Sequence, residues 1–197
     1  MLHYGRLLYV LWLAWWLYWV ISAFGAKTTR RRESSASRLS HVLPLLVGVT
    51  LIAWPQLHLG HWMSWQFLPP GPARFASALV LVAAGLAFTV WARAQLGANW
   101  SGSVTLKEGH ELVRSGPYAY VRHPIYTGLL VALLGTAVAC GELRALVGLV
   151  VVAAAFVRKL RIEERFMRES FPEQHARYSS EVPALIPFAR PRRSAPR

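Results

Sequence analysis

The sequence predicts an all-α membrane protein that forms a single domain over residues 1–197 and crosses the bilayer about five times. Three observations predict this fold class: 54% of the 197 residues are hydrophobic, nine are tryptophan, and the apolar residues gather in runs separated by polar segments. A helix needs about 20 apolar residues to cross roughly 30 Å of hydrocarbon. A soluble domain of this length normally carries fewer tryptophans and less apolar residue.

The first three spans are expected at residues 7–24, 39–57 and 75–91. The first run is rich in tryptophan and tyrosine, and its positive charges, among them Lys27 and Arg30, follow it. A signal peptide carries its charges in front and lacks such aromatic bulk, so a membrane span is the better interpretation. The stretch at residues 55–72 has no Lys, Arg or Glu but has Trp, His and four Pro residues, which is typical of a loop at the outer membrane interface.

The last two spans are expected at residues 125–141 and 143–160, on either side of Glu142. Both runs are short and almost nothing connects them, so they are predicted to form a hairpin. Whether both arms cross the whole bilayer is left open by the sequence. Cys140, the only cysteine of the chain, lies inside the first arm and is expected to be a buried structural thiol rather than a reactive one.

The charge pattern predicts the topology. The net charge is +13, but the basic residues stand in short segments between apolar runs, so a nucleic-acid partner is not expected. Five crossings with the N-terminus outside leave only three of the 22 Lys and Arg on the outer side: Arg6, Arg74 and Arg144. Residues 97–123 and 161–190 are then cytoplasmic segments, and residues 191–197 form a basic tail that contacts anionic lipid.

The segment at residues 115–128 concentrates prolines, glycines, tyrosines and an Arg-His pair just before a predicted span. Gly116 can take a positive φ in the turn, and Pro124 suits the first turn of a helix because its missing N–H has no partner there. The helix is therefore expected to begin at His123 and Pro124, with Arg122 beside its N-terminus as an anion site. The alternative is that Arg122 and His123 only anchor the span at the headgroups, where the tyrosines form an aromatic belt.

Two adjacent acids, Glu163 and Glu164, follow the last apolar run on a continuing helix. The chain from His123 to the hairpin turn is nearly as long as the chain from the turn to Glu163, so the acids are expected at the depth of the Arg-His pair. The alternative is pairing along the helix surface at four-residue spacing, with Lys159 for one acid and Arg168 for the other. Because adjacent residues point about 100° apart, one acid is expected to pair locally while the other faces the site.

These motifs together resemble the isoprenylcysteine carboxyl methyltransferase family and its phospholipid methyltransferase relatives over about residues 95–188. The resemblance rests on LGANWS, LVRSGPYAYVRHPIYTG, the downstream pair of acids and ARYSSEVPALIPF. It implies a membrane methyltransferase that uses S-adenosylmethionine, releases S-adenosylhomocysteine and takes a lipophilic or lipidated substrate from the bilayer. It also implies a cofactor pocket at the cytoplasmic end of the last two spans, closed by the C-terminal segment.

The resemblance further implies roles for individual residues. Three are implied to be catalytic: Arg122, Glu163 and Glu164. These three are implied to bind the cofactor together with six others: Gly116, Pro117, Tyr118, His123, Pro124 and Tyr126. Two more are implied to contact the substrate: Asn99 and Trp100. The chemistry is suitable, because the cofactor's carboxylate matches a guanidinium, its ammonium and ribose hydroxyls match a glutamate, and its sulfonium matches a tyrosine face.

Several alternatives stay open in the sequence. The acceptor is an isoprenylcysteine or other isoprenoid acid, a phospholipid amine or a small thiol, and an anionic acceptor needs positioning and desolvation rather than a strong base. Another enzyme class is a membrane reductase that uses NADPH, because sterol-reductase-like proteins resemble this C-terminal architecture. No metal is expected, since His58 and His61 have no carboxylate or cysteine nearby. Compactness and composition indicate a bacterial inner-membrane protein.

Overall fold

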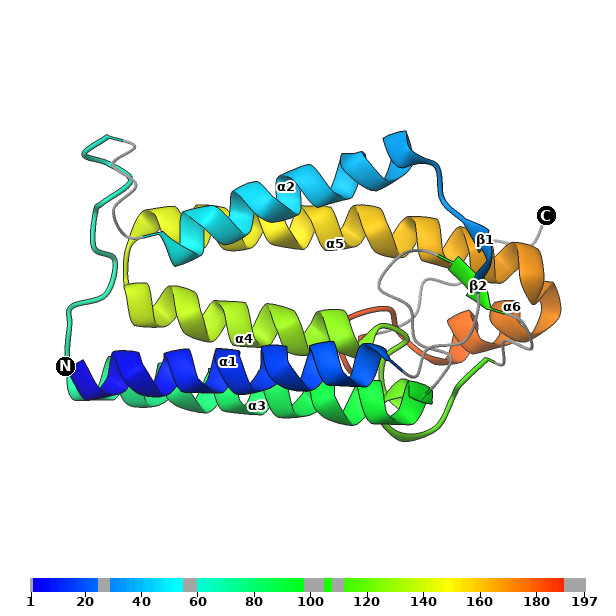
Figure 1. Cartoon of the computed structure of the whole chain (residues 1–197), viewed down its shortest axis with the longest axis horizontal. Coiled ribbons are helices and arrows are strands. Elements are labelled where there is room, and N and C mark those ends of the chain that lie inside the picture. Colours follow the sequence, from blue (N-terminus) through cyan, green and yellow to red (C-terminus); the bar gives the residue numbers. More distant parts are fainter. Residues whose placement is uncertain (1, 25–28, 55–59, 98–104, 108–111, 190–197) are drawn as a thin grey trace.

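The structure, a computed structural model, describes five stretches of the chain: residues 2–24, 29–54, 60–97, 105–107 and 112–189 (Figure 1). The expected substrate contacts Asn99 and Trp100 lie outside these residues, as do His58 and the tail at 191–197. All five apolar runs fall within the described residues apart from the last three positions of the second run.

Each apolar run is a helix, so the helical character of the fold is confirmed. The five helices are α1 (Leu2–Ala23), α2 (Ser35–Ala53), α3 (Pro72–Leu96), α4 (Pro124–Cys140) and α5 (Leu143–Ser170). The first three are long and apolar enough to cross a membrane, and α4 is a shorter apolar helix of 17 residues. A further helix, α6 (Pro172–Glu181), follows α5.

Two features differ from the prediction. The expected boundary at residue 160 falls inside α5, which runs unbroken for 28 residues because the polar residues after it are good helix formers. A short antiparallel sheet was also not expected, in which β1 (Thr29–Arg32) pairs with β2 (Thr105–Lys107). It joins the segment after α1 to the segment after α3, at the same end of the molecule as α6 (Figure 1).

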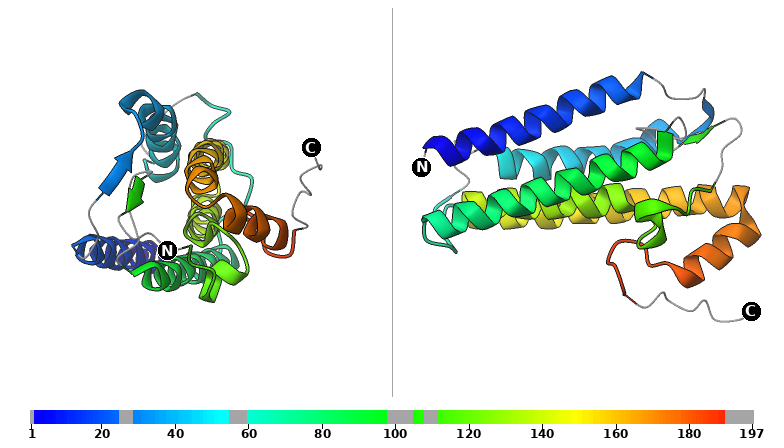
Figure 2. Two further views of the ribbon diagram at one scale, coloured as in Figure 1. Left: turned by 90° about the vertical axis from the view of Figure 1, so that its right-hand side faces the viewer. Right: turned by 90° about the horizontal axis from the view of Figure 1, so that it is seen from below.

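The helices pack closely as two pairs at positions where glycines meet. α3 lies along α4, and a Cβ added to Gly85 would lie 2.5 Å from the Gly128 carbonyl oxygen. α2 lies along α5, and a Cβ added to Gly48 would lie 2.7 Å from the Gly148 carbonyl oxygen. Small residues let backbones approach in a membrane, where packing rather than the hydrophobic effect joins helices. The turn between α4 and α5 then joins the two pairs into one bundle (Figure 2).

α1 is attached to the bundle by tryptophan. Trp15 Nε1 donates to Thr89 Oγ1 of α3 at 2.7 Å, and Trp12 Nε1 donates to Thr136 Oγ1 of α4 at 3.1 Å. Near the C-terminal end of α1, Arg93 of α3 donates to the carbonyl oxygen of Ser22. α1 therefore contacts α3 and α4, while α2 is packed against α5.

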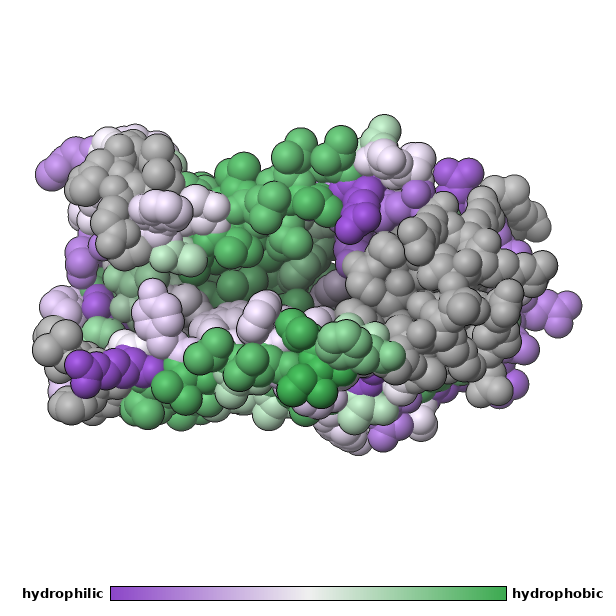
Figure 3. Space-filling model, viewed as in Figure 1, coloured by the Kyte–Doolittle hydropathy of each residue, from purple (hydrophilic) through white to green (hydrophobic). Residues whose placement is uncertain are grey.

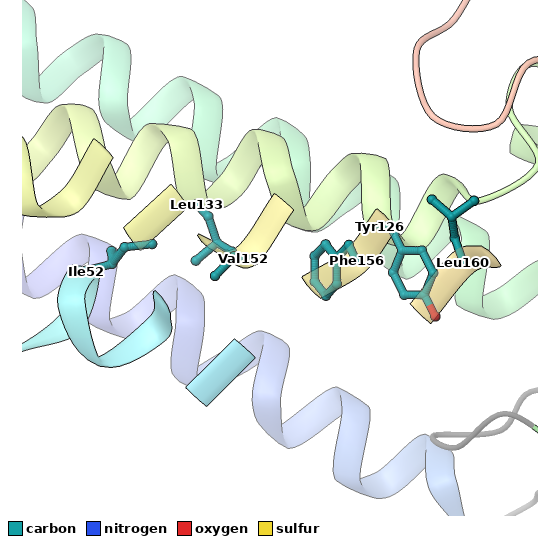
Figure 4. Packing of buried hydrophobic residues seen from close by; sticks show 6 residues of the cluster. All are labelled: Ile52, Tyr126, Leu133, Val152, Phe156 and Leu160. Atoms are coloured by element: carbon teal, nitrogen blue, oxygen red, sulfur yellow. The ribbon is translucent and has the colours of Figure 1, made fainter. Parts of the chain in front are cut away.

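The apolar core follows the α4–α5 hairpin toward its polar end. Six buried residues of α2, α4 and α5 form one row: Ile52, Tyr126, Leu133, Val152, Phe156 and Leu160 (Figure 4). Tyr126 stacks on Phe156 with the ring centroids 4.9 Å apart. Tyr126 therefore lies near the polar end of the row, beside Leu160, where its hydroxyl can reach polar groups beyond the core (Figure 4).

The opposite end of the hairpin is closed by a buried arginine. Arg144, at the start of α5, is 2% exposed, and its Nε donates to Glu142 Oε2 at 2.6 Å. Its Nη1 donates to three carbonyl oxygens at the end of α2: Leu51, Ile52 and Trp54. The last carbonyls of a helix have no partner within it, so Arg144 caps α2.

The close contact between α3 and α4 leads to a prediction. Gly85→Ala is expected to lower the free energy of unfolding by about 1–3 kcal/mol, because the new Cβ would press on backbone atoms that cannot move aside. Gly5→Ala is the matched control, since a Cβ there meets nothing within 4 Å and alanine favours the helix. The measurement is thermal unfolding in detergent micelles, and equal stability of the two variants would contradict the glycine contact.

Candidate active site

The turn predicted before the last two spans is present. Gly116 takes a left-handed φ of 59°, which glycine adopts without steric cost, and it opens the 3-10 turn Gly116–Ala119. Pro117 and Tyr118 are buried in this turn. Tyr178 of α6 donates a hydrogen bond of 2.6 Å to the Tyr118 carbonyl oxygen, so α6 covers the turn.

α4 begins at Pro124, as predicted, with His123 as its N-cap. The segment after α6, residues 182–189, crosses this helix start and is called the closing strap below. The amide groups of Arg122 and His123 donate to two successive strap carbonyl oxygens at 2.9 and 3.0 Å. The anion site expected here is therefore partly filled by the protein itself, because strap carbonyls satisfy donors that precede a helix.

Glu163 and Glu164 of α5 both reach the start of α4, so the predicted equality of depth is present. Glu163 Oε2 lies 3.5 Å from His123 Nδ1, and Glu164 Oε1 lies 3.3 Å from His123 Nε2. The expectation that only one acid faces the site is wrong, because the two ring nitrogens point in different directions and each meets one acid. Glu163 also forms its expected local pair with Lys159 at 4.0 Å, whereas Glu164 pairs across the hairpin with Arg122.

Tyr126 meets the acids through its hydroxyl, which donates to Glu163 Oε1 at 2.5 Å. Its ring stacks with His123 at a centroid distance of 5.6 Å and with Phe156 at 4.9 Å. Lys159 Nζ lies 5.5 Å from the same centroid. The ring of Tyr126, which the resemblance implies to be cofactor-binding, is therefore in contact with groups of the protein on its faces.

Arg122 connects the acid on α5 to the closing strap. Its Nε donates to Glu164 Oε1 at 2.9 Å, and its Nη2 bonds to the same oxygen. Its Nη1 donates to the carbonyl oxygens of Ser179, at 3.3 Å, and Val182. The side chain is 11% exposed. The sequence assigns this guanidinium to the carboxylate of a ligand, but its donors are used within the protein, so Arg122 acts here as a positioning residue.

The cluster holds opposite charges in a half-buried setting. Burial opposes ionisation of Glu164, but hydrogen bonds and charges from His123 and Arg122 outweigh it and hold the pKa of Glu164 at about 2. Burial also opposes ionisation of Glu163, yet His123 and Lys159 lower the pKa of Glu163 below its ordinary value. Burial favours the neutral form of His123, but the two carboxylates raise the pKa of His123. Two carboxylates thus face an imidazolium and two further cations.

His175 of α6 is a candidate that the sequence analysis missed. It is 4% exposed, and its Nδ1 has no hydrogen-bond partner within the described parts of the chain. Burial lowers the pKa of His175, so the ring is neutral at neutral pH and can bond an uncharged polar group of a ligand. The signal that would have found it is spacing, since His175 and Tyr178 lie three residues apart on the buried face of α6.

A continuous cavity of about 930 Å³ joins the charged cluster to the apolar interior. One end of the cavity is charged and is lined by Arg122, Glu163, Glu164 and His175. Tryptophans of α1 and apolar side chains of α2, α4 and α5 line the rest, as far as Arg144. The hollow between α1 and α2 in Figure 3 is apolar and open on that face of the molecule. Such a cavity can bring a polar ligand and a lipid-borne one together.

Comparison with known proteins identifies relatives of the chain. The sequence model of the Isoprenylcysteine carboxyl methyltransferase (ICMT) family matches residues 78–169. Protein-S-isoprenylcysteine O-methyltransferase B of Arabidopsis thaliana is 36% identical over 42% of this chain and 42% of that protein. Protein-S-isoprenylcysteine O-methyltransferase of Mus musculus is 30% identical over 70% of this chain and 46% of that protein. Cobalt-zinc-cadmium resistance protein CzcN of Cupriavidus metallidurans is 34% identical over 48% of this chain and 44% of that protein.

A solved structure is also similar in fold. The eukaryotic intramembrane Ras methyltransferase ICMT matches with a TM-score of 0.50 and 24% identity, over 78% of this chain and 52% of that chain. At this identity the likeness concerns the fold alone. The chain spans about half the length of the relatives it matches. The resemblance noted in the sequence is confirmed, and the matched segment starts earlier than the motifs do.

The pKa shifts of the two site histidines predict opposite pH dependences of stability. The folded pKa of His123 is raised above 6.5, so its contribution to stability is complete below pH 6.5 and is lost as the pH rises through that folded pKa. The folded pKa of His175 is lowered, so its contribution is complete above pH 6.5 and is lost as the pH falls. His123→Gln should therefore remove an alkaline fall in stability, and His175→Gln an acid one. Thermal unfolding in micelles across this range is the measurement, and identical pH slopes for both variants would contradict it.

Proposed function

We propose that this chain is a member of the isoprenylcysteine carboxyl methyltransferase family, whose sequence model matches residues 78–169, and that it is an S-adenosylmethionine-dependent membrane methyltransferase with a lipophilic acceptor. The observation that supports this best is the continuous cavity, which is charged at one end and apolar along the rest. A water-soluble methyl donor and a lipid-borne acceptor need such a place to meet. The proposed activity is the one in the names of the Arabidopsis and mouse relatives.

The residues at the charged end of the cavity fit the cofactor by their chemistry. Glu163 and Glu164 offer acceptor oxygens for an ammonium or for ribose hydroxyls, and the positive charges of His123 and Lys159 favour a bound carboxylate. The imidazole of His175, whose Nδ1 has no hydrogen-bond partner in the described parts of the chain, suits an uncharged polar group of the cofactor. When bound, the cofactor supplies a methyl group activated by its sulfonium charge.

The protein's own part is to fix these charges and to exclude water. Arg122 holds Glu164 in place, and through its bonds to the end of α6 and to the closing strap it keeps the site covered. An acceptor that is already an anion needs only positioning and desolvation in such a site. This favours a carboxylate acceptor, as on an isoprenylated cysteine, over a phospholipid amine that would first have to lose a proton.

We propose that the acceptor enters laterally between α1 and α2, where the hollow meets the bilayer (Figure 3). α4 and the apolar part of α5 are proposed as the fourth and fifth spans, because they pair along their lengths with α3 and α2. The proposed orientation has the N-terminus outside and the charged cluster in the cytoplasm of a bacterium. It is supported by the charge pattern of the sequence, and α6 and the small sheet group at one end of the bundle (Figure 1).

The proposal predicts which ligands the purified protein binds and uses. In lipid nanodiscs, S-adenosylhomocysteine should raise the midpoint of thermal unfolding, because it binds only the folded site, and NADP should not. Labelled methyl groups should pass from S-adenosylmethionine to a farnesylated cysteine analogue with a free carboxylate. The matched control is the methyl ester of that analogue, which has no site for the group. Stabilisation by NADP alone would instead support a reductase.

The two acids lead to a second prediction. Glu163→Gln and Glu164→Gln should each lower methyl transfer by about 100-fold or more, since each removes a fixed charge from a desolvated site. Glu169→Gln is the control on the same helix, because that acid is 39% exposed and its pair with Arg165 is worth only about 0.3–0.5 kcal/mol. Turnover is compared at matched folded fraction. Normal turnover in both site variants would reduce the pair to a structural role.

A further inference from the structure

The closing strap ends in a turn that displays two large apolar side chains. Ala189 N donates to the Ile186 carbonyl oxygen at 3.2 Å, with Pro187 and Phe188 between them. Phe188 has a φ of 63°, and among the described residues it alone combines a side chain with a positive φ. A proline at the second position of a four-residue turn and a positive φ at the third are typical of a type II turn. The third position of such a turn favours glycine.

The side chains of this turn point away from the protein. Ile186 is 70% exposed and Phe188 is 90% exposed. A bulky residue in the left-handed region is sterically costly, and a segment that needed only a turn would place glycine there. A strained backbone at an exposed apolar residue indicates that a large apolar side chain is required at this position.

The depth of the turn is set by the residues before it. Thr127 Oγ1 donates to the Leu185 carbonyl oxygen at 2.6 Å, and Thr127 lies in the first turn of α4. Ala184 and Leu185 pack against the core row that contains Tyr126. The strap therefore returns from α6 to the level at which α4 enters its apolar stretch, and Ile186 and Phe188 are exposed at that level.

We propose that Ile186 and Phe188 insert into the cytoplasmic leaflet of the bilayer and that this anchor holds the closing strap over the site. The proposal rests on α4 being a membrane span, as in the proposed function. It adds that contact with lipid keeps the strap where its carbonyl oxygens accept from the amides of Arg122 and His123. Closure of the site then depends on the membrane. Four arginines follow the turn in the sequence, and basic residues beside an inserted aromatic one are attracted to anionic lipid: Arg190, Arg192, Arg193 and Arg197.

A depth measurement tests the insertion directly. Phe188→Cys in a Cys140→Ser background carries one bimane label, and the protein is placed in nanodiscs with lipids brominated in the upper acyl chain. Bromolipid should quench the label at 188 strongly and a label at Gln174→Cys, on the exposed face of α6, weakly. Equal quenching at the two sites would overturn the proposal. The proposal would also be overturned if the fluorescence of the label at 188 changed with the number of copies of the chain per disc and not with bromination. That result would indicate that a second copy of the chain covers the turn.

A pair of substitutions tests the link to the site. Phe188→Gly relieves the backbone but removes the apolar side chain, whereas Phe188→Leu keeps an apolar side chain at the same backbone cost. In nanodiscs, Phe188→Gly should weaken S-adenosylhomocysteine binding by about three- to tenfold, and Phe188→Leu should bind nearly as the parent chain does. Equal or tighter binding by Phe188→Gly would show that the turn is only structural. Failure of the parent chain to bind this ligand would count against the proposed function and leave the quenching result standing.

Discussion

The structure depends on a helical hairpin that returns two carboxylates to the level of one histidine. A carboxylate removed from water is costly unless a cation and hydrogen bonds replace the water. His123 can meet this need for two acids because a protonated imidazole has two N–H groups, and here one is near Glu163 and the other near Glu164. A hairpin arm longer by one helical turn would displace the acids by about 5 Å and separate both of them from His123.

The cavity follows from the choice of helix pairs. Glycine contacts join α3 to α4 and α2 to α5, and the turn at Gly141 joins the two pairs. α1 is then held on α3 and α4 by the indole N–H groups of Trp12 and Trp15. Because α1 is held on one pair and α2 belongs to the other, the space between α1 and α2 is bounded by side chains and opens to the side. The same tryptophans that attach α1 form part of the cavity wall.

The sequence predicts the helices and the meeting of the acids with His123, because apolar runs mark spans and equal arms mark equal depth. It does not predict how the arginines are used, since a charge count treats Arg144 and Arg122 as topology and ligand signals whatever carbonyl lies nearby. The strands and His175 were missed for a related reason. Their partners are far along the chain, and neither β1 nor α6 carries a long periodic pattern. The contacts between helices at glycine could not be predicted from the sequence either. Gly85 in an apolar run looks like any other small residue, and only the folded structure shows the second backbone that lies against it.

The arginine cap at the hairpin turn links an early helix to a residue that is made much later. The final carbonyls of α2 take a donor from Arg144, which is synthesised 93 residues after Leu51. Before α5 is made, this donor is absent, and carbonyls at a helix end then need water or another partner. Arrival of the hairpin supplies the donor and fastens the earlier helix to the later one. A ribosome-bound intermediate that ends before α5 would thus lack the arginine cap on α2.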